Sequence, residues 1–222
     1  MAQSWFITGT DTGVGKTQVS AALLTALVRR DRSAVGMKPV ASGCLQTLQG
    51  LICEDVEILR AAGNVPASPT ELNPYAFATA TSPHLAAATA RVTIDIGVIQ
   101  SHYRQLAARA DHVVVEGIGG WLVPIDNRLT MAEVANSLAL PVILVVDLRL
   151  GSFNHALLSA QAIAASGCRL VAWVANNTSA DAPDGYLVGL TALLDAPLLG
   201  HLPYSSAIDV LADCLDLSCI GV

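Results

Sequence analysis

Short runs of β-branched and other apolar residues alternate along the chain with longer segments rich in alanine and leucine. We expect strands at 5–8, 34–38, 112–116, 142–147, 170–175 and 198–201. We expect helices at 17–30, 53–62, 82–91, 95–108, 131–137, 152–165 and 184–194. Strands that are apolar throughout are typical of a parallel sheet buried on both faces. The pattern therefore predicts an α/β fold with a mostly parallel central sheet and helices on both faces.

Length, composition and charge indicate a single cytoplasmic domain spanning residues 1–222. The chain is 53% hydrophobic, but Gly, Pro or charged residues interrupt its apolar runs well before the ~18 residues that cross a bilayer. The start, MAQSWFITG, lacks the basic region and long apolar core of a signal peptide. Five cysteines show no CxxC pair and no metal-ligand spacing, as expected of reduced thiols. A net charge of −6 gives no reason to expect nucleic acid as a partner.

Residues 9–17 read GTDTGVGKT and lie between an expected strand and an expected helix. This order is the context of a P-loop, in which backbone N–H groups surround phosphates, Lys16 reaches the β and γ phosphates and Thr17 holds Mg²⁺. The partial positive charge of the helix N-terminus adds to the attraction. The strict pattern has glycine where this chain has Thr10, and Gly9 comes one position early.

Polar residues end four of the expected strands, at the edge where doubly wound sheets bind their ligands. They are Lys38, Glu116, Asp147 and Asn176. Glu116 is the strongest carboxylate candidate for Mg²⁺, since it ends an apolar strand before a tight turn containing Gly117 and Gly119. The alternative is an acidic residue solvated in a loop.

Asp55 has a weaker local signal than Glu116. It lies with Glu54 and Glu57 near the start of an expected helix, where acidic side chains interact favourably with the helix dipole. On local grounds, this structural interpretation is favoured over a role as a metal ligand.

Several other polar residues carry a functional and a structural interpretation each. Lys38 precedes a stiff Pro-containing turn and can neutralise charge during phosphoryl transfer, or it is simply an exposed lysine at the sheet edge. Ser42 is a ligand donor or a turn former. Asn154 directs its amide at a carboxylate or caps a helix. Asn176 contacts a nucleotide base or supports a loop.

Taken together, the motifs resemble those of the dethiobiotin synthetase family, over most of the chain and in the family's order. The matching segments are GTDTGVGKT (9–17), GMKPVASG (36–43), the helix with Asp55, NPYAF (73–77), TSPH (81–84), VEGIGGW (115–121), LPVILVV (140–146), LGSFNH (150–155), WVAN (173–176) and APLLGHLP (196–203). The family's loop shares the early glycine. After Pro203 the chain is shorter and more apolar than the family pattern. A glutamate that the family has near the nucleotide has no clear counterpart in this chain, although Asp209 lies close to its expected position.

The resemblance implies a P-loop NTPase-like fold and a set of site residues. Mg²⁺ would be bound by Thr17, Asp55 and Glu116. The catalytic residues would be Lys38, Lys16 and Thr12. The nucleotide would contact Gly13, Val14, Gly15, Lys16, Thr17, Gly117 and Gly119, with Asn176, Pro203 and Tyr204 beside the adenine. The diamine substrate would contact Thr12, Lys38 and Ser42. In a homodimer, the helix start formed by Gly151, Ser152, Phe153 and Asn154 would receive the carboxylate of the substrate held mainly by the other subunit.

The resemblance also implies the reaction. CO₂ adds to an amine of 7,8-diaminononanoate to give a carbamate, ATP phosphorylates the carbamate, and the second amine closes the ring with release of phosphate. An alternative is a partitioning-type ATPase switched by nucleotide-dependent dimerisation, but its signature lysine is replaced here by Asp11. A second alternative, an amidotransferase-linked synthetase, requires a glutaminase domain for which the chain has no room.

Overall fold

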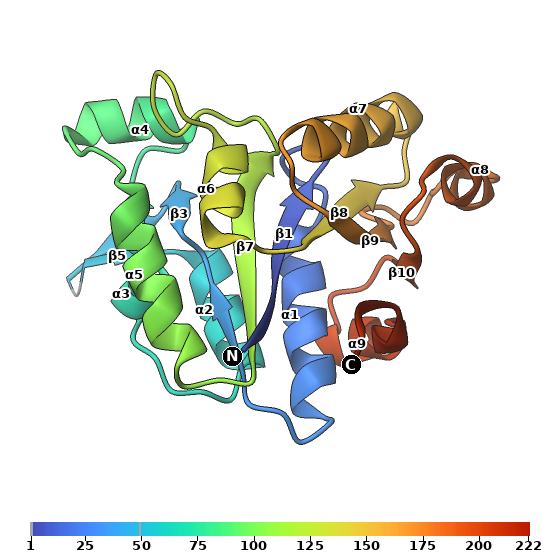
Figure 1. Ribbon diagram of the computed structural model, residues 1–222, viewed down its shortest axis with the longest axis horizontal. Helices are drawn as coiled ribbons and strands as arrows, with labels where there is room; N and C mark the ends of the chain where they lie inside the picture. The colour runs from blue at the N-terminus through green and yellow to red at the C-terminus, as the bar shows by residue number, and fades with distance from the viewer. Residues whose placement is uncertain (1, 49) are drawn as a thin grey trace.

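A six-stranded parallel sheet forms the centre of the molecule, which the computed structural model describes over residues 2–48 and 50–222 (Figure 1). The strand order is β10-β9-β8-β1-β7-β2, and each neighbouring pair runs parallel. The strands are β1 (Gln3–Gly9), β2 (Ala34–Met37), β7 (His112–Gly120), β8 (Val142–Asp147), β9 (Leu170–Asn176) and β10 (Leu198–Leu202). All six expected strands are confirmed, and β1, which leads into the P-loop, lies between β7 and β8.

Helices cover both faces of the sheet, as the apolar strands predicted. The seven expected helices are α1 (Lys16–Val28), α2 (Glu54–Ala62), α4 (Pro83–Ala90), α5 (Ile96–Ala107), α6 (Met131–Leu138), α7 (Ser152–Ala165) and α8 (Tyr186–Leu193). Apolar residues of α1 and of α9 (Ile208–Asp213) form the core on one face, and those of α5, α6 and α7 form it on the other. Helices α1 and α9 lie side by side (Figure 1). Among the described residues, we find no helix with the length and apolar character needed to cross a membrane.

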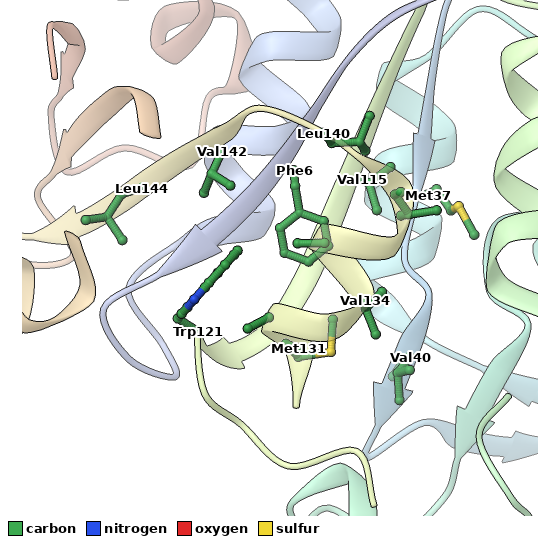
Figure 2. Close-up of a cluster of buried hydrophobic side chains, with 14 of the residues drawn as sticks. Phe6, Met37, Val40, Val115, Trp121, Met131, Val134, Leu140, Val142 and Leu144 are labelled. Carbon is green, nitrogen blue, oxygen red and sulfur yellow. The ribbon is translucent and has the colours of Figure 1, made fainter. Parts of the chain in front are cut away.

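The larger core cluster is built around Phe6 of β1, whose side chain is fully buried. Its ring meets Trp121 edge to face, with ring centroids 6.1 Å apart. Figure 2 shows Val115 of β7 and Met131 and Val134 of α6 beside it. Removing a buried phenylalanine side chain typically costs about 3–5 kcal/mol of stability. This packing therefore fixes the strand that leads into the P-loop against β7 and α6.

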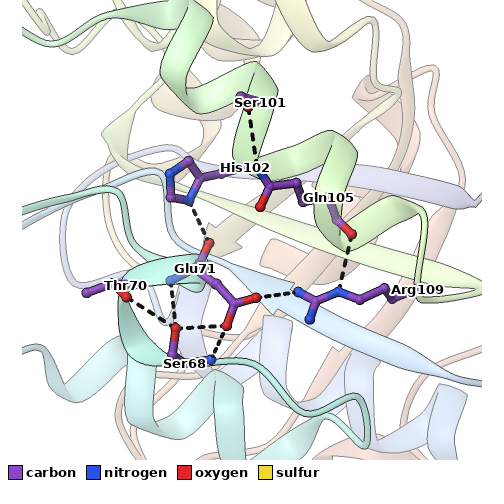
Figure 3. Close-up of polar contacts among 7 residues, drawn as sticks. All are labelled: Ser68, Thr70, Glu71, Ser101, His102, Gln105 and Arg109. Carbon is purple, nitrogen blue, oxygen red and sulfur yellow. Dashed lines mark hydrogen bonds and ion pairs between the residues drawn. The ribbon is translucent and has the colours of Figure 1, made fainter.

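A polar network ties the short helix α3 (Pro69–Leu72) to α5 (Figure 3). Ser68 and Glu71 form a capping box, in which each side chain bonds to the backbone N–H of the other residue. The Glu71 carboxylate also pairs with Arg109 at 2.8 Å, and the His102 ring lies 3.1 Å from the Glu71 carbonyl oxygen. Hydrogen bonds from the Ser68 backbone and hydroxyl lower the pKa of Glu71 to about 2. The network fixes α3 beside the carboxyl end of β2.

Several short elements were not predicted, because three- or four-residue segments carry too little periodicity. They are β3 (Val40–Ser42) paired with β6 (Tyr75–Phe77), the antiparallel hairpin of β4 (Leu45–Thr47) and β5 (Gly50–Ile52), α3, α9 and the 3₁₀ helix η1 (Leu217–Ile220). One prediction was wrong: Glu116 does not end its strand before a tight glycine turn. Strand β7 continues through Gly120, because the glycine-rich segment shifts its register and then pairs with β1 again, where Gly120 lies opposite Gly9.

Candidate active site

The P-loop packs so tightly that glycine is required at two of its positions. A Cβ atom at Gly9 would lie 2.6 Å from Cγ2 of Val14, which gives a steric reason for the early glycine. Gly15 precedes α1 in the left-handed region, at φ 87°, and a Cβ there would lie 2.1 Å from Nδ2 of Asn176. That amide, at the end of β9, donates a 2.9 Å hydrogen bond to the Val14 carbonyl oxygen. The end of β9 therefore holds the loop through the Asn176 amide.

Lys38 follows the last residue of β2, and its backbone is held on both sides. Its N–H donates to the Leu72 carbonyl oxygen at 2.8 Å, and Nδ2 of Asn73 donates to the Lys38 carbonyl oxygen at 2.6 Å. Leu72 is the last residue of α3, so the network that fixes this helix also fixes Lys38. The side chain is only 3% exposed.

The Lys38 ammonium group lies between two carboxylates that are distant in sequence. Its Nζ is 2.5 Å from Oε1 of Glu116 and 2.9 Å from Oδ2 of Asp55, and it donates to the Gly117 carbonyl oxygen at 3.2 Å. Thr17 Oγ1 donates to the same Glu116 oxygen at 2.8 Å. The site residues predicted from the P-loop, β2, α2 and β7 thus meet in one cluster.

The cluster keeps Lys38 charged. Burial by itself disfavours the ammonium form, but the Glu116 and Asp55 carboxylates outweigh burial and raise the pKa of Lys38 above its usual value. Burial likewise opposes ionisation of Asp55, yet the charge and hydrogen bond of Lys38 lower the pKa of that carboxyl. Lys38 is therefore a fixed cation at neutral pH.

Lys16 has the opposite environment. Its Nζ donates to the Asp11 carbonyl oxygen at 2.9 Å. Burial and the nearby charge of Lys38 lower the pKa of Lys16 from 10.5 to about 8, against the weaker pull of the carboxylates. An anion placed in the P-loop would relieve this destabilised charge.

These groups open onto one cavity of about 500 Å³. Its walls include most of the predicted site residues: Thr12, Gly13, Gly15, Lys16, Thr17, Lys38, Ser42, Asp55, Glu116, Gly119 and Tyr204. Gln18, Ile118 and Thr178 also line it and were not predicted, because nothing in their local sequence distinguishes them. The rarity of lysine is a signal that the sequence did offer. Lys16 and Lys38 are the two lysines of the whole chain, and both line this cavity.

A second cavity of about 740 Å³ is larger but lies at the opposite edge of the sheet, near the amino ends of the strands. Gln3, Tyr103, Pro141 and Arg169 are among the residues that line it. None of the predicted site residues, all of which lie within the described part of the chain, lines this cavity. Convergence of charged groups, not volume, identifies the candidate site.

Some predicted residues do not line the P-loop cavity. Val14 and Asn176 are buried behind the loop, Gly117 contributes the carbonyl oxygen that contacts Lys38, and Pro203 is exposed beside Tyr204. The Asn176 amide donates its hydrogen bond to the Val14 carbonyl oxygen in this structure. Contacts of Asn176 and Pro203 with adenine remain predictions.

The start of α7 also lies outside that cavity. Gly151 precedes the helix at φ 92°, Asn154 is exposed, and Phe153 packs on Tyr186 with ring centroids 4.9 Å apart. The Ser152 hydroxyl is buried and has no hydrogen-bond partner within residues 2–48 and 50–222. These four residues therefore do not line the P-loop cavity of their own chain.

The Thr17, Asp55 and Glu116 side chains fit the donor set of a nucleotide-bound Mg²⁺. Such an ion takes a hydroxyl and one or two carboxylates, and phosphate oxygens and water complete its shell. Oε2 of Glu116 is buried without a hydrogen-bond partner in the described part of the chain, so it is an unused acceptor. No group of three or more His, Cys, Asp or Glu side chains among the described residues could hold a metal. The donor set fits a metal that arrives with phosphate.

Comparison with known proteins gives a consistent picture. A family model described as an AAA domain matches residues 3–210. The chain is 42% identical to the ATP-dependent dethiobiotin synthetase BioD of Nitrosospira multiformis, over 100% of this chain and 98% of that protein. It is 46% identical to the protein of the same name from Aromatoleum aromaticum, over 93% of each chain.

Solved structures with this fold are P-loop NTPases of low sequence identity. The cell division protein MinD of Aquifex aeolicus, in its complex with MinC, aligns with a TM-score of 0.59 at 16% identity, over 97% of this chain and 88% of that chain. MinD of Pyrococcus horikoshii, complexed with Mg-ADP, aligns with a TM-score of 0.57 at 15% identity, over 99% and 89% of the two chains. These likenesses establish the P-loop NTPase fold and nothing further.

Proposed function

The chain belongs to the family of ATP-dependent dethiobiotin synthetases, and we propose that it makes dethiobiotin from 7,8-diaminononanoate, CO₂ and ATP. The observation that carries the proposal is the position of Lys38. A buried lysine held by Glu116 and Asp55 lies on the wall of the same cavity as the P-loop. Phosphoryl transfer depends mainly on such positioned charge.

We propose three chemical steps. An amine of the substrate adds to CO₂ and loses a proton, which gives a carbamate. A carbamate oxygen attacks the γ-phosphorus of ATP, the bond to the bridging oxygen breaks, and ADP leaves. The second amine then attacks the carbonyl carbon of the mixed anhydride, phosphate leaves, and the ring closes. Every bond is formed between substrate atoms, so no protein nucleophile is needed.

The residues of the cavity have distinct roles in this proposal. Backbone N–H groups of residues 13–17 bind the phosphates. The ammonium group of Lys16, whose own charge lacks a strong partner, neutralises part of the phosphate charge. Lys38 stabilises the negative charge that develops on the transferred phosphoryl group. Mg²⁺, held by Thr17, Asp55 and Glu116, would supply further charge neutralisation.

Substrate contacts are also proposed. Thr12 and Ser42 line the cavity beside Lys38 and would bind the diamine end of the substrate. Asn176, Pro203 and Tyr204 would flank the adenine, and the 65% exposed Tyr204 side chain has room for it.

We propose a homodimer in which residues 151–154 of one subunit complete the site of the other. Two features support this: these residues lie outside the cavity of their own chain, and the Asn154 side chain in the first turn of α7 is exposed. We further propose that residues 1–222 act as one domain in the cytoplasm, where the five unpaired cysteines would stay reduced.

A phosphate-release assay tests the proposal. With ATP, bicarbonate and 7,8-diaminononanoate, phosphate release should depend on the diamine, because the carbamate is the phosphoryl acceptor. A protein that binds ATP but releases no phosphate in response to the diamine would defeat the proposal. Release that is independent of the diamine would favour the partitioning-type ATPase.

A further inference from the structure

Two cysteines, Cys44 and Cys53, flank the β4–β5 hairpin directly before its first strand and directly after its second. The antiparallel register pairs Thr47 with Gly50, Gln46 with Leu51 and Leu45 with Ile52. Continued by one residue, this register sets Cys44 opposite Cys53. Directly opposed residues in antiparallel strands have Cα atoms about 4.5–5.5 Å apart. A disulfide needs a Cα separation of about 4.4–6.8 Å, so a pair in this continued register would meet the spacing for a bond.

Both thiols point into the protein and interact with each other. Cys44 is 4% exposed and Cys53 is 9% exposed, and both belong to the larger core cluster. The neighbouring Cys53 thiol lowers the pKa of Cys44 below the usual value of a cysteine. Because the thiolate is the nucleophilic form, Cys44 is the sulfur that reacts first.

The pair lies between two parts of the candidate active site. Cys44 is two residues beyond Ser42, and Cys53 is two residues before Asp55, which pairs with Lys38. Ser42 and Asp55 line the P-loop cavity. A covalent bond between the cysteines would join the segment after β3 to the start of α2.

We propose that Cys44 and Cys53 are a modification site, which a hydroperoxide converts to a reversible disulfide that slows turnover. The effect on turnover rests on the proposed function, whereas formation of the bond does not. Disulfides of cytosolic proteins are usually transient and redox-sensing, which is the behaviour described here.

The chemistry balances with hydrogen peroxide as the oxidant. The Cys44 thiolate attacks one peroxide oxygen, the O–O bond breaks, and the departing hydroxide takes a proton to become water, leaving a sulfenic acid. The Cys53 sulfur attacks the Cys44 sulfur, the S–O bond breaks, and hydroxide leaves as water with the Cys53 proton. Two thiols and one peroxide thus give one disulfide and two waters, with the two electrons supplied by sulfur.

Peptide mapping by mass spectrometry tests the site without reference to activity. Treatment of the full chain with hydrogen peroxide should give a linked pair of peptides containing Cys44 and Cys53, and dithiothreitol should release them. Cys44→Ser and Cys53→Ser each remove the link, and either variant suffices if the other fails to fold. Cys168→Ser is the matched control and keeps the link. The proposed pair is overturned if no such link forms under conditions that oxidise Cys168.

Turnover measured on the same samples tests the effect on the active site. Displacements of about 1 Å in a catalytic arrangement cost up to about 10²-fold in rate, so we expect diamine-dependent phosphate release to fall about 10-fold or more on oxidation. The rate should return with dithiothreitol. The rate of Cys53→Ser, which cannot form the link, should be insensitive to hydrogen peroxide. A linked wild-type protein at full rate would overturn the regulation. A reduced protein with no diamine-dependent release would overturn the proposed function alone.

Discussion

The two lysine-bearing regions of the P-loop cavity shift the pKa of their lysines in opposite directions. In the P-loop, burial and a neighbouring cation lower the pKa of Lys16 to about 8. At the end of β2, two carboxylates overcome burial and raise the pKa of Lys38. The P-loop lysine therefore gains most from an anion that comes with the ligand, whereas the β2 lysine already has its anions within the protein.

This difference separates binding from chemistry. A cation without a strong internal partner is suited to attracting phosphate, and its charge is restored when phosphate arrives. A cation fixed by Glu116 and Asp55 keeps its position whether or not a ligand is present, which is what electrostatic stabilisation of a transition state requires. Substitutions in each region and titration of both lysines test this distinction.

Replacing the fixed cation should have the largest effect. Lys38→Ala should lower diamine-dependent phosphate release by about 10³-fold or more, the scale seen when a transition-state cation is removed in phosphoryl transfer. ATP binding should persist, because the P-loop is intact. Lys38→Arg is the matched control for charge and should rescue little, since the planar guanidinium does not replace a compact ammonium. Near-normal ring closure by Lys38→Ala would contradict the assigned role.

Glycine substitutions in the P-loop test how closely the loop is held. Gly15→Ala should reduce the free energy of unfolding by about 2–3 kcal/mol, because its Cβ displaces the Asn176 amide and its φ is positive. Gly13→Ala is the control: its φ is also positive, at 77°, but its Cβ would meet nothing within 4 Å. About 1 kcal/mol of strain is expected there. Equal urea-denaturation losses in the two variants would show that contact with Asn176 is unimportant.

The smallest expected effect is the difference in pKa between the two lysines themselves. Because the chain has two lysines, selective ¹³C labelling at Cε gives a two-signal NMR spectrum. One signal should titrate near pH 8, and the other should remain protonated beyond the usual lysine range. The unfolded chain binds more protons than the folded chain between about pH 8 and 10.5, so Lys16 adds stability as pH rises through that window.

A bound phosphate should raise the pKa of Lys16, so nucleotide binding above pH 8 should take up a proton. Lys16→Met should remove the signal that titrates near pH 8 and leave the other unchanged. Two signals with the ordinary pKa of lysine would contradict the comparison of the two regions.

The sequence alone predicted the sheet, the P-loop and Glu116 as a candidate site residue, because each rests on a strong local pattern. Lys38 carried two interpretations on local grounds, and the resemblance to the family favoured the catalytic one. Apolar runs predict buried strands, and a glycine loop between strand and helix predicts a phosphate site. The role of Asp55 could not be recognised locally, since acidic residues are common at helix starts. Its pairing with Lys38 depends on how α2 packs beside β2, which is a tertiary property.

Other features depended on close contacts that no local pattern encodes. The early glycine at position 9 is explained by the close packing of the Val14 side chain against it. The Asn176 amide donates a hydrogen bond to the Val14 carbonyl oxygen of the loop. Strand β7 runs past Glu116 because pairing with β1 overrides the turn preference of glycine. The opposition of Cys44 and Cys53 depends on the register of a hairpin too short to predict.

Incorporation of labelled carbon tests the proposed reaction most directly. The protein is incubated with ATP, 7,8-diaminononanoate and ¹³C-labelled bicarbonate, and the product is examined by mass spectrometry. We expect a cyclic product that carries one labelled carbon, formed together with ADP and phosphate in equal amounts. Hydrolysis of ATP without labelled carbon in any product would contradict the assignment of this cavity to ring-closing carboxylation.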